Sequence, residues 1–150
     1  MATGQRLSEQ LSDAECLDLL SSVNVGRVVF TMGALPAIAP VSFAVEDGDI
    51  VFATTLGSPV AKATDEAVVA FEAGVFGDEA APGWSVSLTG LATSVPYIGR
   101  EGLEHLVTWT PAQSLQLVRI HPAGISGFRL LPAAHGNGSS AAGTTMGASG

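Results

Sequence analysis

The sequence predicts a mainly β protein, an antiparallel barrel of six to seven short strands with two or three short peripheral helices. Three observations lead to this fold class. Short apolar runs rich in β-branched residues recur along the chain, separated by Gly, Pro and Asp. The longest run, residues 84–95, alternates apolar and hydroxyl residues, which is typical of a half-buried antiparallel strand. Most strands follow one another through hairpin turns, which disfavours a parallel doubly wound sheet.

The composition limits the class of protein and its partners. A chain of 150 residues forms one domain of common size, and its 47% hydrophobic content hints at a buried oligomer interface. The net charge of −8, with six scattered basic residues, disfavours nucleic acid and anionic membrane surfaces as partners. A single cysteine allows no intrachain disulfide, and no signal peptide or membrane-spanning run is visible. We therefore expect a cytoplasmic protein.

The N-terminal part is expected to contain one helix. Residues 1–10 form a flexible N-terminus in this interpretation. Ser12 and Glu15 have the spacing of a capping box, and the apolar residues that follow recur at helical intervals, which predicts a helix over residues 13–22. Cys16 is interpreted as a core residue of this helix, because no basic neighbour in the sequence would activate its thiol.

The central part reads as strands joined by tight turns. A first strand is predicted over residues 25–31, and a hairpin over residues 36–55 turns at Asp47-Gly48. A short helix over residues 59–64 and a mostly buried strand over residues 67–72 follow.

The C-terminal part completes the predicted barrel. Gly90 lies inside the long strand 84–95, which indicates a bulge or a bend. A short helix is predicted over residues 98–106. Two separate strands are expected over residues 114–120 and 124–130, with His121-Pro122 between them. The uncharged tail, residues 132–150, is expected to be disordered.

One strand end could bind an anion. The second strand of the hairpin leads into Thr54, Thr55, Gly57 and Ser58, and a helix then begins at Pro59. Hydroxyl groups and backbone N–H groups at such a position favour negative charge, and the only lysine, Lys62, lies one turn further along. The alternative interpretation is structural: Ser58 is an N-cap with Pro59 at the first helical position. The sequence leaves both open.

Other chemistry finds little support in the sequence. The three histidines, His105, His121 and His135, are too far apart for a metal-binding motif. No nucleophile elbow and no glycine-rich nucleotide-binding pattern is present.

Two further residues have alternative interpretations. Glu72 ends a buried strand, and we expect it to pair with Arg27 or Arg119. Trp84 stands at the start of the long strand, where it packs either into the core or against a flat ring ligand.

Taken in order, these motifs resemble the pyridoxamine 5′-phosphate oxidase-like family of flavin-binding split β-barrels. The matching segments are Leu11-Ser12, Glu15 to Leu20, Val25 to Val28, Pro36, Pro40-Val41, Ile50 to Phe52, Thr54, Gly57-Ser58, Val69 to Glu72, Gly83 to Val86, Thr89-Gly90, Ala92, Ile125 to Gly127 and Arg129. The similarity covers residues 11–131, which defines the predicted domain.

The resemblance implies a homodimer with FMN in a groove at the dimer interface. It places Pro40, Val41, Ser42 and Phe43 beside the isoalloxazine ring, where backbone groups contact it. It assigns the ribityl phosphate to the segment from Thr54 to Lys62, with Thr54, Thr55, Gly57, Ser58 and Lys62 as binding residues. Trp84 and Ser85 lie near the ring, often from the partner chain. The function implied is a flavin-dependent oxidoreductase acting on a small molecule.

The sequence departs from the family pattern at the phosphate. Ala53 stands where family members usually have Arg, and Pro59 and Val60 stand where they have Lys or Arg. Gly74 stands where family members often have an acidic residue after the Phe-Glu pair, here Phe71-Glu72. Two alternatives therefore stay open: a reductase that uses the deazaflavin F420, whose acidic tail the scarce basic residues disfavour, and a cofactor-free regulatory or ligand-binding dimer.

Overall fold

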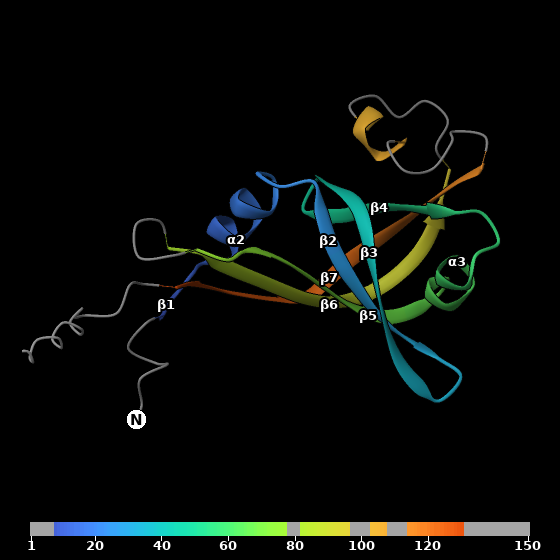
Figure 1. Cartoon of the computed structure of the whole chain (residues 1–150), viewed down its shortest axis with the longest axis horizontal. Helices are drawn as coiled ribbons and strands as arrows, with labels where there is room; N and C mark the ends of the chain where they lie inside the picture. Colours follow the sequence, from blue (N-terminus) through green and yellow to red (C-terminus); the bar gives the residue numbers. More distant parts are fainter. Residues whose placement is uncertain (1–7, 78–81, 97–102, 108–113, 131–150) are drawn as a thin grey trace, which may run out of the picture.

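A computed structural model of the chain describes residues 8–77, 82–96, 103–107 and 114–130. Seven strands form one antiparallel sheet in the order β1-β7-β4-β3-β2-β5-β6, and β6 also pairs with β7. That extra pairing closes six strands into a barrel, with β1 added outside on β7 (Figure 1). The predicted antiparallel barrel is thus confirmed. The elements are β1 (Ser8–Gln10), α2 (Asp13–Leu20), β2 (Val25–Met32), β3 (Leu35–Glu46), β4 (Asp49–Thr55), α3 (Pro59–Thr64), β5 (Ala67–Val75), β6 (Trp84–Val95), the 3₁₀ turn η1 (Glu104–Val107) and β7 (Leu115–Leu130).

The hairpin between β3 and β4 forms as the sequence predicts. Its five paired positions run from Ser42 opposite Ala53 to Glu46 opposite Asp49. Asp47 and Gly48 make the turn at positive φ, 54° and 82°, which matches a two-residue turn of primed type.

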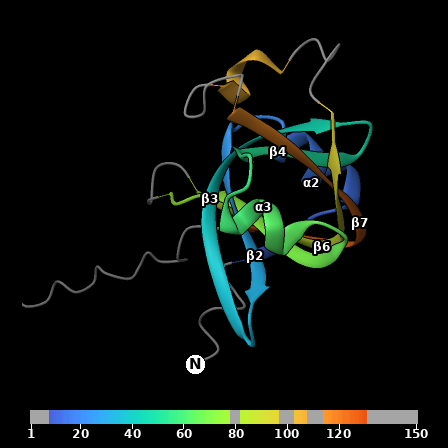
Figure 2. The ribbon, with the colours of Figure 1, turned by 90° about the vertical axis from the view of Figure 1, so that its right-hand side faces the viewer.

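The capping box and the helices predicted over residues 13–22 and 59–64 are confirmed, although α2 ends at Leu20. The Ser12 hydroxyl accepts from the Glu15 backbone N–H at 3.2 Å, and the Glu15 carboxylate accepts from the Ser12 N–H at 2.8 Å. The two helices cover opposite ends of the barrel (Figures 1 and 2). None of the helices within the described residues is long and apolar enough to cross a lipid bilayer.

The C-terminal strands differ from the prediction. One continuous strand, β7, replaces the two expected over 114–120 and 124–130. The reason is a bulge: Thr89 faces Gly124 and Gly90 faces Pro122, which leaves Ala123 as the extra residue. A proline is tolerated in a strand at such a position, so His121-Pro122 bends the strand instead of ending it. The bulge predicted at Gly90 is confirmed.

Two predicted segments are only partly described. Of the stretch 1–10 expected to be flexible, Ser8–Gln10 form β1 and pair with β7, which the sequence did not indicate. Of the helix predicted over 98–106, the structure describes the 3₁₀ turn η1. The tail 132–150 lies outside the described residues.

The core fills the barrel and is aromatic at its centre. Phe43 and Phe71 are fully buried, and their rings meet edge to face with centroids 4.8 Å apart. Cys16 is buried in the same cluster, as predicted. A second, smaller cluster lies where η1 packs on the outer side of β4 and consists of Val51, Ala53, Leu103, Leu106 and Leu117.

Candidate functional site at the open edge of strand β3

Strand β3 has one edge that is only partly paired. It pairs with β2 from Leu35 to Ser42, but its pairing with β4 begins only at Ser42. Within the described residues, no other strand pairs with the stretch Leu35–Val41 on that side. This stretch is therefore an edge of backbone polar groups inside an otherwise closed barrel.

The alternation of the strand determines which groups this edge offers. Phe43 donates its N–H to the Asn24 carbonyl at 3.0 Å, which turns the backbone of every second residue of β3 toward β2. Pro36, Ile38 and Pro40 consequently direct their backbone groups to the open edge. The two prolines have no N–H, so the edge is a poor template for another strand, while its carbonyl groups can accept hydrogen bonds from a ligand.

A hollow of about 170 Å³ lies where β3 and β4 diverge. Its lining is uncharged and consists of Pro40, Val41, Ser42, Ala53, Thr54, Thr55, Val60 and Leu106. Five of the predicted site residues, Pro40, Val41, Ser42, Thr54 and Thr55, are thus brought together from two separate strands. The predicted neighbour Phe43 instead points its side chain into the barrel core.

The polar groups at the start of α3 form hydrogen bonds with one another and within the helix. Ser58 is the N-cap, and its hydroxyl accepts from the Ala61 N–H at 3.1 Å and lies 3.1 Å from the Thr54 hydroxyl. Lys62 donates its N–H to the Ser58 carbonyl, and Pro59 has no N–H to donate. The capping role of Ser58 is confirmed, and it leaves few backbone donors of this short helix for an anion.

Two contacts of His105 that the sequence analysis did not predict lie beside the hollow. His105 Nε2 lies 2.8 Å from the Phe43 carbonyl, and Ser42 donates its hydroxyl to the His105 carbonyl at 3.4 Å. These contacts hold η1 against β3 and place Leu106 in the lining. The sequence carries no local signal for this, because about sixty residues separate η1 from β3.

Lys62 lies on the other side of the turn between β4 and α3. Together with Gly57 it lines a second hollow, of about 430 Å³, between α3 and the turn that joins β2 to β3. We call it the Lys62 hollow, and its other lining residues are Thr31, Met32, Gly33, Pro59 and Ala63. The predicted phosphate cation is therefore not in the lining of the hollow that Thr54 and Thr55 share.

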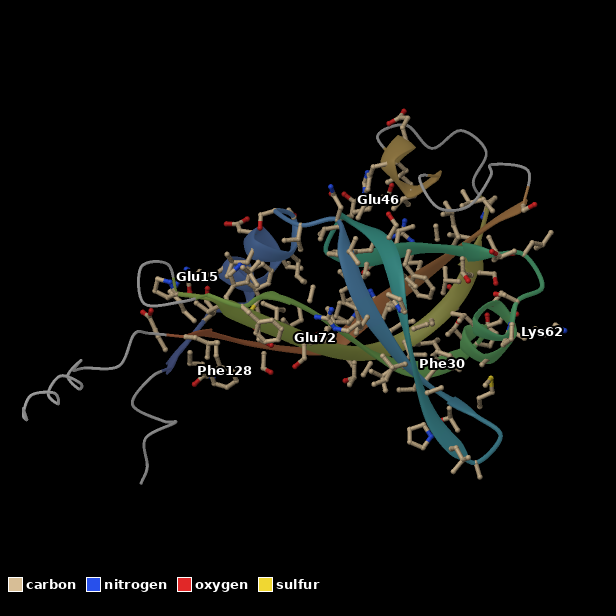
Figure 3. The ribbon with its side chains drawn as sticks, viewed as in Figure 1. Glu15, Phe30, Glu46, Lys62, Glu72 and Phe128 are labelled. Carbon is tan, nitrogen blue, oxygen red and sulfur yellow. The ribbon has the colours of Figure 1, made fainter. Side chains whose placement is uncertain are left out.

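Trp84 and Ser85 lie at the far end of the barrel. Val95, at the other end of β6, faces Leu117, which in turn faces Ala53 in the first hollow. Trp84 is eleven residues from Val95 along β6, which corresponds to roughly 35 Å in a strand. Figure 3 shows Phe128, the cross-strand partner of Ser85, at the opposite end of the molecule from Lys62. Trp84 is buried, so the core alternative holds within one chain.

Glu72 forms an ion pair, which is the structural role that the sequence analysis favours. Arg27 donates its Nε–H to the Glu72 carboxylate at 2.7 Å, and Ser85 donates its hydroxyl to the same carboxylate at 3.4 Å. Of the two partners expected, Arg27 is therefore the one found.

Arg119 instead holds the β3–β4 hairpin. It contacts Glu46 and, at 2.8 Å, one oxygen of the Asp49 carboxylate. The other oxygen of Asp49 lies 2.8 Å from His121 Nδ1. Burial alone would lower the pKa of Arg119, but its hydrogen bonds to Asp49 and Glu46 raise that pKa overall. No cluster of potential metal ligands occurs within the described part of the chain.

The sequence model of the family named pyridoxamine 5′-phosphate oxidase matches residues 12–129 of this chain. The uncharacterised protein Rv0080 of Mycobacterium tuberculosis is 38% identical over 129 residues, which cover 81% of this chain and 85% of that protein.

Solved structures have the same fold. A FAD-binding protein of Mycobacterium smegmatis is 32% identical with a TM-score of 0.63, covering 82% of this chain and 98% of that one. A FAD-binding protein of Mesorhizobium loti has a TM-score of 0.67 over 82% of this chain and 98% of that one, and its 20% identity shows a likeness of fold alone.

Proposed function

This chain belongs to the pyridoxamine 5′-phosphate oxidase family, and on that premise we propose that it is an FMN-binding oxidoreductase that acts on a small molecule. One observation carries the proposal: Pro40 to Ser42 and Thr54-Thr55, distant in sequence, line one hollow beside the open edge of β3. The FAD-binding relative from M. smegmatis supports a flavin as the class of cofactor.

The residues at this edge suit the two ends of a flavin mononucleotide. Backbone carbonyl groups of β3 would accept hydrogen bonds from the ring, and the hydroxyls of Thr55 and of either Thr54 or Ser58, which are hydrogen-bonded to each other, would donate to the phosphate. A bound flavin supplies the hydride or electron transfer itself. The chain's own contribution is to orient the ring along β3 and to exclude water through Leu106, which His105 and Ser42 hold in place.

The lack of charge in the hollow sets the expected affinity. Charged side chains are absent from its lining within the described residues, because Ala53 and Val60 occupy positions where the family usually has cations. Neutral hydrogen bonds are roughly half as strong as charge-assisted ones. The phosphate is therefore held more weakly here than in members with both cations.

The second part of the proposal is a homodimer. The strands β2, β3, β5, β6 and β7 present one continuous outer face, which we call the outer sheet face. By register its members are Pro36, Ile38, Pro40, Arg27, Val29, Thr31, Val68, Ala70, Glu72, Ser87, Thr89, Leu91, His121, Gly124 and Ser126.

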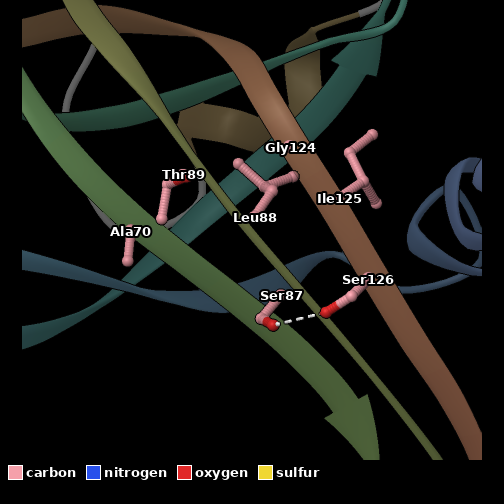
Figure 4. A pocket seen from close by; sticks show the side chains of 7 residues that line it. All are labelled: Ala70, Ser87, Leu88, Thr89, Gly124, Ile125 and Ser126. Carbon is pink, nitrogen blue, oxygen red and sulfur yellow. Dashed lines mark hydrogen bonds between the residues drawn. The ribbon is translucent and has the colours of Figure 1, made fainter.

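This face is poor in charge and rich in exposed apolar groups. Val68, Ile38 and Leu91 are 72%, 67% and 47% exposed. The two charged residues of the face, Arg27 and Glu72, form an ion pair, so their charges cancel. A shallow depression of about 410 Å³ lies on this face, and in it the hydroxyl oxygens of Ser87 and Ser126 are 3.5 Å apart (Figure 4). A second copy of the chain would cover this surface and could bring its own Trp84 and Ser85 to the flavin.

A cofactor-free dimer is the second candidate, and the uncharged hollow is the observation that favours it. An F420-dependent reductase has less support, because the acidic tail of F420 would need basic residues around it. Among the described residues that line the two hollows, Lys62 is the one basic residue. The cytoplasmic location stays a prediction.

The test is titration of the purified apoprotein with FMN, followed by quenching of flavin fluorescence. Thr54→Val removes one hydroxyl at the hollow and is expected to weaken FMN binding about tenfold, the size of one hydrogen bond to a charged group. Thr93→Val is the matched control, because Thr93 lies in β6 outside the lining. Absence of any flavin binding would favour the cofactor-free dimer.

A further inference from the structure

The Lys62 hollow is a second concave site, and it shares no lining residue with the hollow at the β3 edge. Its volume of about 430 Å³ lies within the range of roughly 300–1,000 Å³ that is usual for small-molecule sites. A Cβ placed on Gly33 or Gly57 would meet no atom within 4 Å, so both glycines face open space. The proposed flavin site leaves this hollow without a function.

The walls of the Lys62 hollow are mainly apolar. Met32 is half exposed on one side, and Pro59 and Ala63 belong to α3 on the other. Two exposed leucines adjoin these walls, since Leu35 is the cross-strand partner of Met32 and Leu56 is next in sequence to a lining residue. Apolar side chains gathered in water mark a binding surface, and a thioether packs favourably against aromatic rings. The hollow therefore favours an aromatic ring.

Lys62 gives the hollow a single positive charge. Its stem lines the hollow, and its amine extends away from the barrel (Figure 3). Among the residues that the structure describes, none makes an ion pair with this amine, and none of those that line the hollow is acidic. Glu66, four residues further on, lies beyond the end of α3. The amine is therefore available to an anionic group of a ligand.

The backbone beside Lys62 favours a carboxylate over a phosphate. Phosphates at helix starts bond several backbone N–H groups. Here the Ala61 N–H donates to the Ser58 hydroxyl at 3.1 Å, the Lys62 N–H donates to the Ser58 carbonyl at 3.0 Å, and Pro59 has no N–H. One ammonium group with few backbone donors around it matches an anion of one charge.

We propose that the Lys62 hollow binds a small aromatic monocarboxylate. The ring lies against Met32, Pro59 and Ala63, and the carboxylate meets the ammonium group of Lys62. This ligand site goes beyond the proposed oxidoreductase function and does not depend on flavin binding at the β3 edge.

The experiment titrates indole-3-acetate into the full-length protein labelled with ¹³C at the methionine methyl groups, and follows the methyl signals by NMR. The chain has three methionines, so the spectrum of Met32→Leu identifies the Met32 signal. We expect the ring current of the probe to shift this signal upfield, with saturation that gives a dissociation constant of about 1 mM or below.

Matched variants and probes test the charge and the ring separately. Lys62→Gln should weaken indole-3-acetate about fivefold, the size of an exposed ion pair, while Lys62→Arg should retain the affinity. Arg129→Gln removes a positive charge at the other end of the barrel and should leave the affinity unchanged. Indole-3-ethanol keeps the ring without the charge, so it should bind more weakly and respond little to Lys62→Gln. Octanoate keeps the carboxylate without the ring and should also bind more weakly.

The outcomes that overturn the inference are distinct from those that concern the flavin. An unmoved Met32 signal at about ten times the expected dissociation constant would overturn it. Equal affinities for indole-3-acetate and indole-3-ethanol, or tighter binding of octanoate, would overturn the assigned ligand class. FMN titration of the same protein sample is read separately, because its failure overturns the proposed function and leaves the Met32 response as expected.

Discussion

Cys16 lies in a tightly packed part of the barrel core. Its thiol is fully buried, and a Cβ placed on Gly127 would lie only 2.6 Å from its sulfur. Burial raises the pKa of this thiol, and the nearby carboxylates of Asp13 and Glu15 raise it further. The thiolate is therefore disfavoured in the native state, and Cys16 is not a reactive cysteine.

This shift in pKa predicts a loss of stability in alkali. A pKa that is higher in the folded than in the unfolded state stabilises the fold below the unfolded value, near 8.5, and the benefit is lost as the pH rises through the folded value. The free energy of unfolding should thus fall from about pH 8 upward. Urea titrations between pH 7 and pH 10 measure it, with Cys16→Ala as the variant that lacks the titrating group. Identical pH profiles for both proteins would contradict the prediction.

At the residue scale, the sequence predicts roles best where the reason is local. The capping of α3 by Ser58 and the burial of Cys16 follow from neighbouring residues, and both are confirmed. The roles of His105 and Leu106 depend on contacts with β3 and β4, about fifty to sixty residues earlier in the chain. No periodicity or spacing can encode such contacts before the strand order is known.

At the scale of elements, the bulge between β6 and β7 has a strict steric requirement. A Cβ on Gly90 would lie 2.0 Å from the His121 carbonyl oxygen, whereas a Cβ on Gly124 would have open space around it. Gly90→Ala should therefore destabilise the protein by about 1–3 kcal/mol or more through overpacking. Gly124→Ala is the matched control and should change stability by less than about 1 kcal/mol. Thermal unfolding of both variants makes the comparison, and equal melting temperatures would refute it.

Helix α2 depends on its capping box. Ser12→Ala removes the hydroxyl that accepts from the Glu15 N–H and should cost about 1 kcal/mol of stability, the usual value for an N-cap. Hydrogen bonds from the Ser12 backbone and hydroxyl also lower the pKa of Glu15. A lowered pKa stabilises the fold above the unfolded value and is lost as the pH falls through the folded one, so the difference between Ser12→Ala and the wild type should shrink in acid. Ser22→Ala, at the other end of this helix, is the control.

Elements with a local signal are predicted well, and those that depend on a partner strand are not. Asp47-Gly48 marks its hairpin in the sequence alone. By contrast, β1 exists only because β7 lies beside it, and β7 continues past Pro122 only because the bulge opposite Gly90 accommodates the proline. The sequence places a break there because proline cannot donate to a regular ladder.

At the scale of the whole molecule, the proposed dimer gives the next prediction. Val68 lies on the outer sheet face and is 72% exposed in the single chain. Val68→Glu would bury an unpaired charge in the proposed interface, which costs several kcal/mol, and should convert the dimer to a monomer. Val68→Thr keeps the β-branched shape without charge and should remain dimeric. Sedimentation velocity distinguishes the two, and a wild-type monomer at micromolar concentration would contradict the proposed assembly.

The barrel itself was predictable, but the pair of strands that closes it was not. Alternating strands and short turns indicate an antiparallel sheet, and the resemblance to a known family indicates its topology. The pairing of β6 with β7 along twelve positions closes the sheet, and this depends on long-range register that hydrophobic periodicity does not contain. The same limit explains why the two hollows beside α3 could not be told apart from the sequence.

The position of β7 has a consequence for biosynthesis. This strand of 16 residues pairs with β6 along one edge and with β4 and then β1 along the other. The ribosome makes it after every other strand of the barrel. Until it emerges, the nascent chain has two open sheet edges, on β4 and β6, each able to pair with a neighbouring polypeptide. Assembly of this barrel must therefore be completed after most of the chain has been translated, and chaperones that cover exposed strands would act in that interval.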